Sequence, residues 1–250
     1  AGQILIPTYP LIGNYGINEE DVESRQIQVA GFGVREHCLE PSHRQSQLTL
    51  DDYLRSQGVM GISRIDTRAV TRRLRSKGVM MGMITCEMTP EEALERLSDT
   101  PSYGSQDFVR QVSTSAQYEW DSSKAPSARH PIVVLDCGLK FNILRLLKRM
   151  GYKPIAVPAN TSAEDILSLK PRGIVLSPGP GDPAQLGYAI ETIKKLAQVK
   201  PIMGICLGHQ LLARAFGGDT FKLKFGHRGG NHPVRDLTTG RVYITAQNHG

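Results

Sequence analysis

Apolar runs alternate with amphipathic stretches through the second half of the chain. Short continuous apolar runs predict buried strands, and apolar residues spaced three and four apart predict helices packed against them. Strands and helices are expected in alternation over 132–136, 142–150, 153–157, 163–169, 173–176, 188–198, 202–205 and 207–216. This repeated order predicts a parallel sheet with helices on both faces and ligands at the carboxyl ends of its strands.

The first half is less regular, with short apolar runs separated by many turn residues. Strands are expected at 3–6 and 27–34 and helices at 50–57 and 90–97, with Asp51 and Thr89 as N-caps. We therefore predict an α/β protein in which a smaller mixed α/β or β-rich domain, residues 1–118, precedes the parallel-sheet domain, residues 131–250. Residues 119–130 are polar and are interpreted as the linker.

Composition narrows the class of protein. The chain has 250 residues, 40% of them hydrophobic and 22% charged, which is enough for two cores. It has no apolar run of membrane-spanning length and no secretion signal at its start, and its four cysteines lie far apart without metal-type pairing. We expect a soluble cytoplasmic protein with reduced thiols, no membrane contact and no metal site.

Positive charge concentrates between Arg64 and Lys77, and the formal net charge is +6. The spacing predicts a helix there, with Ile65, Ala69, Val70 and Leu74 as its buried stripe and the arginines outside. A solvated helix face is the first interpretation, and a docking surface for an acidic partner is the second. Nucleic-acid binding is disfavoured, because neither a recognised motif nor interleaved aromatic residues accompany the charge.

Cys206 lies on the expected turn between a strand and a helix, flanked by Gly204 and Gly208. This Gly-x-Cys-x-Gly pattern is typical of a nucleophile elbow, in which glycines relieve crowding around a strained turn. Free N–H groups at the start of the helix favour a thiolate and bind a developing oxyanion. A buried structural cysteine explains the same pattern equally well.

A second candidate segment is Ser-Pro-Gly-Pro-Gly-Asp-Pro at 177–183, directly after an expected strand. Its prolines stiffen the loop and its glycines allow close backbone approach, so it offers rigid main-chain groups to a small polar ligand. A plain turn uses the same residue types. The nearby cysteine turn favours the ligand-binding interpretation.

Together these segments resemble the class I (triad-type) glutamine amidotransferases, and more closely the small, glutamine-hydrolysing subunit family of carbamoyl-phosphate synthetase. The matching segments in the second half are 136–142, 176–183, 204–212, 225–234 and 245–250. In the first half, 7–16 and 61–72 match motifs special to the small-subunit family.

The resemblance implies a glutaminase. Cys206 would attack the side-chain amide of glutamine, form a γ-glutamyl thioester and release ammonia for a large synthetase subunit or domain, which consumes ATP and bicarbonate. The residues that correspond to glutamine-binding positions are Gly179, Gly181, Leu207, Gln210, Asn248 and Gly250. Lys140 corresponds to a site-lining lysine. No cofactor is implied for this chain, which also lacks a phosphate-binding Gly-x-x-x-x-Gly-Lys loop.

The sequence departs from the family pattern at both ends. The His-Pro-Glu motif that supplies the general base does not occur, and the opening strands of the family are missing. We therefore expect a segment truncated at its start and before that motif, with little activity alone. Two rival hypotheses remain, a non-enzymatic interaction subunit with a degenerate site and a stand-alone γ-glutamyl thiol hydrolase. Pyrimidine and arginine biosynthesis are both compatible with the sequence.

Overall fold

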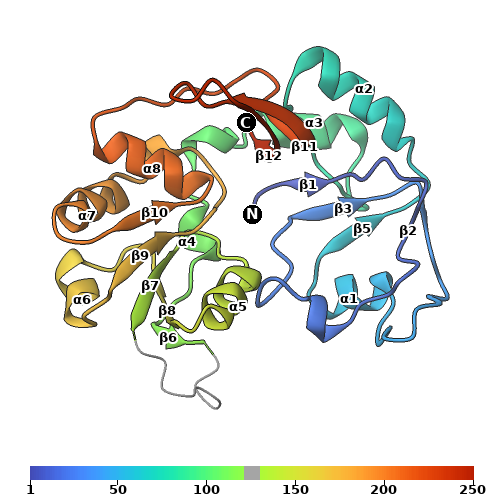
Figure 1. The fold of residues 1–250 in the computed structure, drawn as a ribbon. Helices are drawn as coiled ribbons and strands as arrows, with labels where there is room; N and C mark the ends of the chain where they lie inside the picture. The colour runs from blue at the N-terminus through green and yellow to red at the C-terminus, as the bar shows by residue number, and fades with distance from the viewer. Residues whose placement is uncertain (121–129) are drawn as a thin grey trace.

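The computed structural model describes residues 1–120 and 130–250, and separate sheets organise the two halves of the chain (Figure 1). The larger sheet has the strand order β10-β9-β7-β8-β6, and all of its neighbouring pairs are parallel except β6 with β8. Its strands are β6 (Tyr118–Glu119), β7 (Pro131–Asp136), β8 (Lys153–Pro158), β9 (Gly173–Leu176) and β10 (Ile202–Gly204). Its helices are α5 (Phe141–Arg149), α6 (Ala163–Ser168), α7 (Gly187–Ala197) and α8 (Leu207–Ala215). The predicted alternation of strands and helices is confirmed.

Helices cover both faces of this sheet, as the alternating side chains of β7 require. Val133 and Leu135 belong to one core cluster, together with buried residues of α6, α7 and α8. Val134 points to the opposite cluster, where it packs with Leu144 of α5. Burying each such side chain contributes roughly 1.5–3 kcal/mol, so the two cores hold the strand ends rigidly in place.

The large sheet recruits residues from upstream of the predicted linker. Glu119, assigned to the linker by its polarity, instead lies in β6, and its carboxylate pairs with Lys153 at 2.7 Å. Upstream of it, α4 (Val109–Val112) buries Val109 in the core beneath the sheet. A polar two-residue edge strand carries little apolar signal, which explains the misplaced linker start. Residues 121–129 of the predicted linker lie outside the described residues.

The first half is a mixed α/β unit built on short parallel strands. β1 (Ile4–Leu5), β3 (Gly31–Gly33) and β5 (Met60–Ile62) form one sheet, and β2 (Leu11–Ile12) pairs with β4 (Glu36–His37). Its helices are α1 (Leu50–Ser56), α2 (Thr67–Lys77) and α3 (Pro90–Ser98), and short 3-10 turns occur at η1 (Glu19–Asp21) and η2 (Tyr103–Ser105). The strand expected over 27–34 is therefore confined to three residues.

The helix caps differ from expectation at one position. Thr49, not Asp51, caps α1, since its hydroxyl accepts the Asp52 N–H at 3.1 Å. Thr89 caps α3 as predicted, within a capping box with Glu92. Asp51 lies in the first turn of α1, where a carboxylate is favourable without being the cap.

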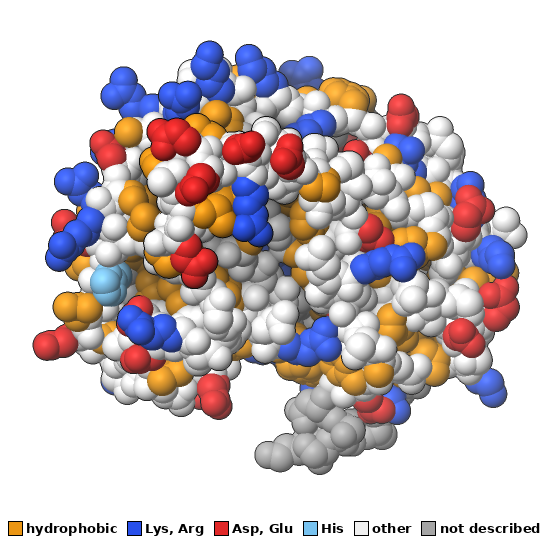
Figure 2. Space-filling model, turned by 180° about the vertical axis from the view of Figure 1, so that it is seen from behind, with side chains coloured by type: hydrophobic (Ala, Val, Ile, Leu, Met, Phe, Trp, Pro, Cys, Tyr) orange, Lys and Arg blue, Asp and Glu red, His pale blue; other side chains and the backbone are white. Residues whose placement is uncertain are grey.

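The buried stripe predicted for α2 is wrong in part. Ala69 is exposed and Leu74 is 36% exposed, while Thr67 is the buried residue of the helix. Lys and Arg side chains gather along the upper edge of the molecule, where α2 lies (Figure 2). Among the described residues, none of the helices has both the length and the apolar character that crossing a bilayer requires.

A hairpin ends the described chain. β11 (His227–Arg235) and β12 (Val242–His249) pair antiparallel, with a register shift between Gly229 and His232. Most of its residues are exposed. The segment leading into it approaches the first half, because the Lys224 carbonyl lies close to Gly78 at the end of α2.

Candidate active site

Cys206 occupies the sharp turn from β10 into α8. Its backbone has φ 53° and ψ −110°, a combination that L-residues rarely adopt and that costs roughly 1–3 kcal/mol. The side chain is exposed, and the Cys206 carbonyl accepts the Gln210 N–H at 3.1 Å as the helix begins. The sequence-predicted elbow is therefore present, and the alternative of a buried structural cysteine is wrong.

The two flanking glycines allow this turn because the chain passes too close to itself for side chains. A Cβ on Gly204 would lie 2.5 Å from the Gly208 carbonyl carbon. A Cβ on Gly208 would overlap the Leu176 carbonyl at the end of β9. The elbow is thus seated on the carboxyl end of the neighbouring strand.

The Ser-Pro-Gly-Pro-Gly loop leaves β9 beside the elbow. Gly179 sits against the Cys137 carbonyl and the Leu207 side chain, with no room for a Cβ. Gly181 follows at φ 90° and lies near Phe108. The structure therefore brings together four predicted glutamine-site residues in two adjacent segments, namely Gly179, Gly181, Leu207 and Gln210.

A third segment, the turn after β7, completes this edge of the sheet. The buried Asp136 carboxylate accepts the N–H groups of Gly138 at 2.9 Å and Leu139 at 2.8 Å through Oδ1. Its Oδ2 accepts the Thr114 N–H at 2.9 Å. Lys140 follows as the N-cap residue of α5, with an exposed side chain.

Cys137 lies in the same turn and is chemically distinct from Cys206. It is fully buried, and burial, reinforced by the Asp136 and Asp107 carboxylates, raises its thiol pKa to about 12. A thiol with so high a pKa remains protonated and unreactive at neutral pH. Of the two cysteines at this edge of the sheet, Cys206 alone combines exposure with an elbow geometry.

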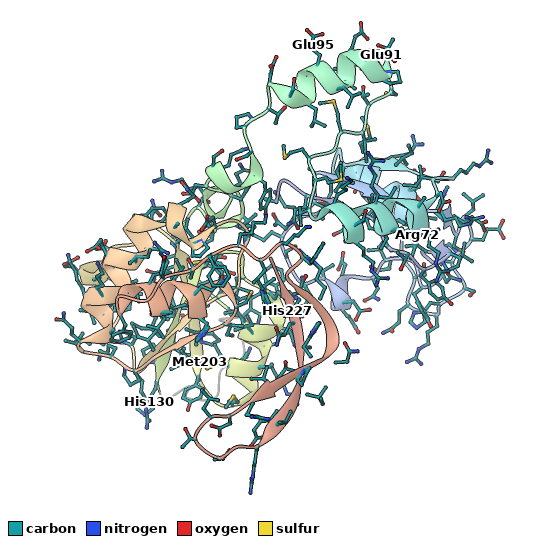
Figure 3. All side chains as sticks on the ribbon, turned by 90° about the horizontal axis from the view of Figure 1, so that it is seen from above. Arg72, Glu91, Glu95, His130, Met203 and His227 are labelled. Atoms are coloured by element: carbon teal, nitrogen blue, oxygen red, sulfur yellow. The ribbon has the colours of Figure 1, made fainter. Side chains whose placement is uncertain are left out.

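The structure does not bring Asn248 and Gly250 to the elbow by any contact described within residues 130–250. Asn248 pairs with Arg228 across the hairpin, and Gly250 lies against Gly226. His227 and His249 share a hydrogen bond of 2.9 Å on the same hairpin. Figure 3 labels His227 on this hairpin and Met203 on β10, the strand that leads into the elbow.

Sequence reasoning placed Ser177 in the candidate loop at 177–183 but assigned no role to its hydroxyl. It did not identify two other residues that shape the site. Thr114 and Phe108 reach the site from distant sequence, where no local pattern marks them. A hollow of about 470 Å³ lies away from Cys206, lined by Arg35, Glu36, Arg64, Ile65 and Asp66. Within the described residues, no group of three or more His, Cys, Asp or Glu is arranged to hold a metal ion.

Comparison with known families covers both halves of the chain. Residues 133–250 match the glutamine amidotransferase class-I family, and residues 1–84 match the CPSase domain of the carbamoyl-phosphate synthase small chain. A carbamoyl phosphate synthase small chain from Nitratidesulfovibrio vulgaris strain Hildenborough is 48% identical, across all of this chain and 70% of the relative. This chain belongs to the carbamoyl-phosphate synthase small chain family.

Other relatives in this family come from further organisms. The small chain from Methanopyrus kandleri is 47% identical, and the match covers 69% of that protein. The small chain from Bacillus caldolyticus is 48% identical over 67% of its length, and both matches include all of this chain. A solved structure from Thermoplasma acidophilum, described as a GMP synthase component, matches at a TM-score of 0.36 and 28% identity over 40% of this chain and 51% of the other.

Membership in the carbamoyl-phosphate synthase small chain family confirms the predicted resemblance and the α/β fold class. The amidotransferase match contains all three segments that meet at the carboxyl edge of the sheet. A stand-alone thiol hydrolase leaves the small-chain match in the first half unexplained. The glutaminase-subunit hypothesis is therefore favoured over both of its rivals.

Proposed function

We propose that this chain hydrolyses glutamine at Cys206 and delivers the ammonia to a large synthetase subunit, which makes carbamoyl phosphate. One observation carries the proposal, an exposed cysteine in a strained elbow at the start of α8, inside a class I amidotransferase domain. Buried structural cysteines have no need of such a turn, whereas a nucleophile must protrude from it.

Glutamine hydrolysis proceeds by two successive displacements at the side-chain amide carbon. The Cys206 sulfur attacks the side-chain amide carbon of glutamine, and N–H groups at the start of α8 face the developing oxyanion. The carbon–nitrogen bond then breaks, and nitrogen leaves as ammonia after taking up a proton. Water hydrolyses the γ-glutamyl thioester, which yields glutamate and restores the thiol.

The neighbouring residues are assigned binding roles. Gly179 and Gly181 present backbone groups to glutamine, while Leu207 and Gln210 line the opposite wall. Asn248 and Gly250 hold the amino-acid end of the substrate, which requires the hairpin to approach the elbow. Lys140 supports the geometry of the site and does not transfer protons.

The general base is assigned to none of the histidines on the hairpin. There the His227 ring contacts the rings of His232 and His249, and it shares a hydrogen bond with His249. His209 projects from the exposed side of α8, three residues beyond the nucleophile. Among the hydrogen bonds of residues 1–120 and 130–250, none joins a histidine ring nitrogen to the Cys206 sulfur.

The partner supplies the remaining reactants. Ammonia passes through a protected path, because free ammonia would take up a proton and lose its nucleophilicity. ATP and bicarbonate bind to the large subunit, and this chain uses no cofactor or metal. The first half docks this subunit, the complex acts in the cytoplasm, and it serves pyrimidine or arginine biosynthesis.

A diazoketone analogue of glutamine tests the proposal on the complete protein assembled with its large subunit. We expect covalent capture at Cys206, with Cys38, Cys86 and Cys137 spared. Cys206→Ala should abolish synthesis from glutamine but retain synthesis from added ammonia, whereas the exposed-thiol control Cys86→Ala should retain both. Glutamine-dependent synthesis by Cys206→Ala would refute the assignment.

A further inference from the structure

We propose that Ser177 is a positioning residue for the glutamine site, because its buried hydroxyl fastens the Ser-Pro-Gly-Pro-Gly loop to the turn after β7. This inference rests on the proposed function in one respect, the assignment of Gly179 and Gly181 to glutamine binding. The fastening itself depends only on the geometry of the two segments.

The hydroxyl of Ser177 makes two hydrogen bonds in a fully buried position. Its Oγ accepts the Cys137 N–H at 2.9 Å, which links it to a residue forty positions earlier. The same hydroxyl donates to the Pro178 carbonyl at 2.9 Å, within its own loop. A hydroxyl has one proton and two lone pairs, so Ser177 can donate one hydrogen bond and accept another at the same time.

The hydroxyl is well placed to set the position of Gly179. Gly179 follows Pro178 directly and already touches the Cys137 carbonyl and the Leu207 side chain. With Pro178 on one side and Pro180 on the other, the loop has little freedom to bend internally. Loss of the hydroxyl would therefore shift the loop as a unit relative to the elbow.

The other end of this link is fixed in place. Asp136 accepts three backbone N–H groups, two from its own turn and one from Thr114, at 2.8–2.9 Å. Backbone pairing of Ser177 N–H with the Leu135 carbonyl at 3.1 Å aligns the two strand ends beneath it. Since the turn is held independently, the loop is the part that moves when the link is cut.

Ser177→Ala removes the hydroxyl and leaves the buried Cys137 N–H without its acceptor. The matched control is Ser113→Ala, because the Ser113 hydroxyl likewise accepts a backbone N–H at a strand end, that of Ala159 at 2.9 Å. Ser113 faces the end of β8 and not the Ser-Pro-Gly-Pro-Gly loop. The Ser113 hydroxyl also donates to the Thr114 carbonyl at 3.4 Å, so each variant loses one accepted and one donated hydroxyl-to-backbone bond, and a purely structural effect would appear in both.

In the complete protein with its large subunit, we expect Ser177→Ala to raise the KM for glutamine about tenfold while kcat stays within about twofold. Synthesis from added ammonia should not change. Ser113→Ala should lower the Tm and leave the KM unaltered. Ser177→Thr retains the hydroxyl and should keep the KM close to that of the wild type, which preserves the test if Ser177→Ala does not fold. A KM rise of equal size in Ser113→Ala or Ser177→Thr would overturn the proposal.

Hydrogen exchange separates this inference from the proposed function. Backbone amides of 177–182 should exchange at least about fivefold faster in Ser177→Ala than in the wild type, while those of the remote helix α1 stay unchanged. Unchanged loop exchange overturns the fastening role whatever the glutaminase assay shows. Absence of glutamine hydrolysis in the wild type would instead refute the proposed function.

Discussion

Gly208, in the first turn of α8, packs directly against the carbonyl of Leu176 at the end of β9, so a methyl group at 208 would overlap it. This contact joins the helix that begins at the nucleophile to the strand that leads into the glycine-rich loop. The relative position of these two segments therefore depends on the absence of a side chain.

Gly208→Ala should destabilise the protein by about 1–3 kcal/mol, because the added methyl forces the helix away from the strand. Urea unfolding measures the change, and glutamine hydrolysis should fall with it. The control is Gly187→Ala at the start of α7, where a Cβ meets nothing within 4 Å. That substitution should be neutral or stabilising by up to about 1 kcal/mol.

Cys206→Gly should unfold at a higher temperature than Cys206→Ala, although neither variant hydrolyses glutamine. Glycine relieves the backbone strain of φ 53° and ψ −110°, which amounts to roughly 1–3 kcal/mol. Glycine also destabilises the fold by about 0.5–1 kcal/mol, because it loses more conformational entropy on folding than alanine does. The strain term is the larger, so a net gain of about 1 kcal/mol is expected. Ala213→Gly inside α8 should show the opposite sign, and a destabilising Cys206→Gly would contradict the strained geometry.

Alkaline pH should weaken the fold through Cys137. Burial raises the pKa of its thiol from 9.0 to about 12. The stabilisation of the folded state that depends on the protonated thiol is therefore fully present below pH ~9 and is lost as the pH rises from about 9 toward 12. A shift of that size amounts to about 2 kcal/mol at pH ~10.5. The half-buried Tyr103 and Tyr118, whose pKa values burial also raises, act in the same direction above pH ~10.

Urea unfolding of the wild type and Cys137→Ala at pH ~8 and ~10.5 isolates the thiol. At the lower pH the variant should be less stable than the wild type, because the substitution leaves a cavity. The difference in free energy of unfolding between the two proteins should be smaller at the higher pH. Cys86→Ser, at an exposed cysteine, should leave the pH dependence as it is. If the difference in free energy of unfolding between wild type and Cys137→Ala is the same at both pH values, titration of Cys137 is ruled out.

The second half should fold only when its upstream segment is present. A protein beginning at Ser102 keeps Phe108, Val109 and Val112, which are at most 7% exposed, whereas one beginning at Glu119 lacks all three. Burial of three such side chains contributes roughly 5 kcal/mol, comparable to the whole stability of many domains. Circular dichroism and urea unfolding of the two truncations would decide, and equal stabilities would count against a structural role for α4.

The sequence predicted the parallel sheet well because its central strands β7, β8 and β9 are mostly buried and its helices are strongly amphipathic. Cys206 and its glycines could be found for the same reason, since a tight turn between buried elements permits few residue types. Residues that act across long sequence separations were not predictable in this way. Thr114 reaches Asp136 and Phe108 reaches Gly181 through tertiary packing, which no local pattern records.

The α2 helix shows the opposite limit. Its spacing predicted a buried stripe, but the exposure of a helix face depends on what packs against it, and Leu74 remains 36% exposed. Polar β6 was missed because two residues at a sheet edge give no usable period. Both errors arise where tertiary neighbours, not the segment itself, determine the outcome.

The antiparallel pairing of β6 with β8 also bears on how the chain matures during synthesis. β6 leaves the ribosome before β7, α5 and β8 have been made. The backbone of Tyr118 therefore has no strand partner until Ala156 of β8 has been synthesised. The segment that ends in β6 can therefore reach its folded position only late in translation.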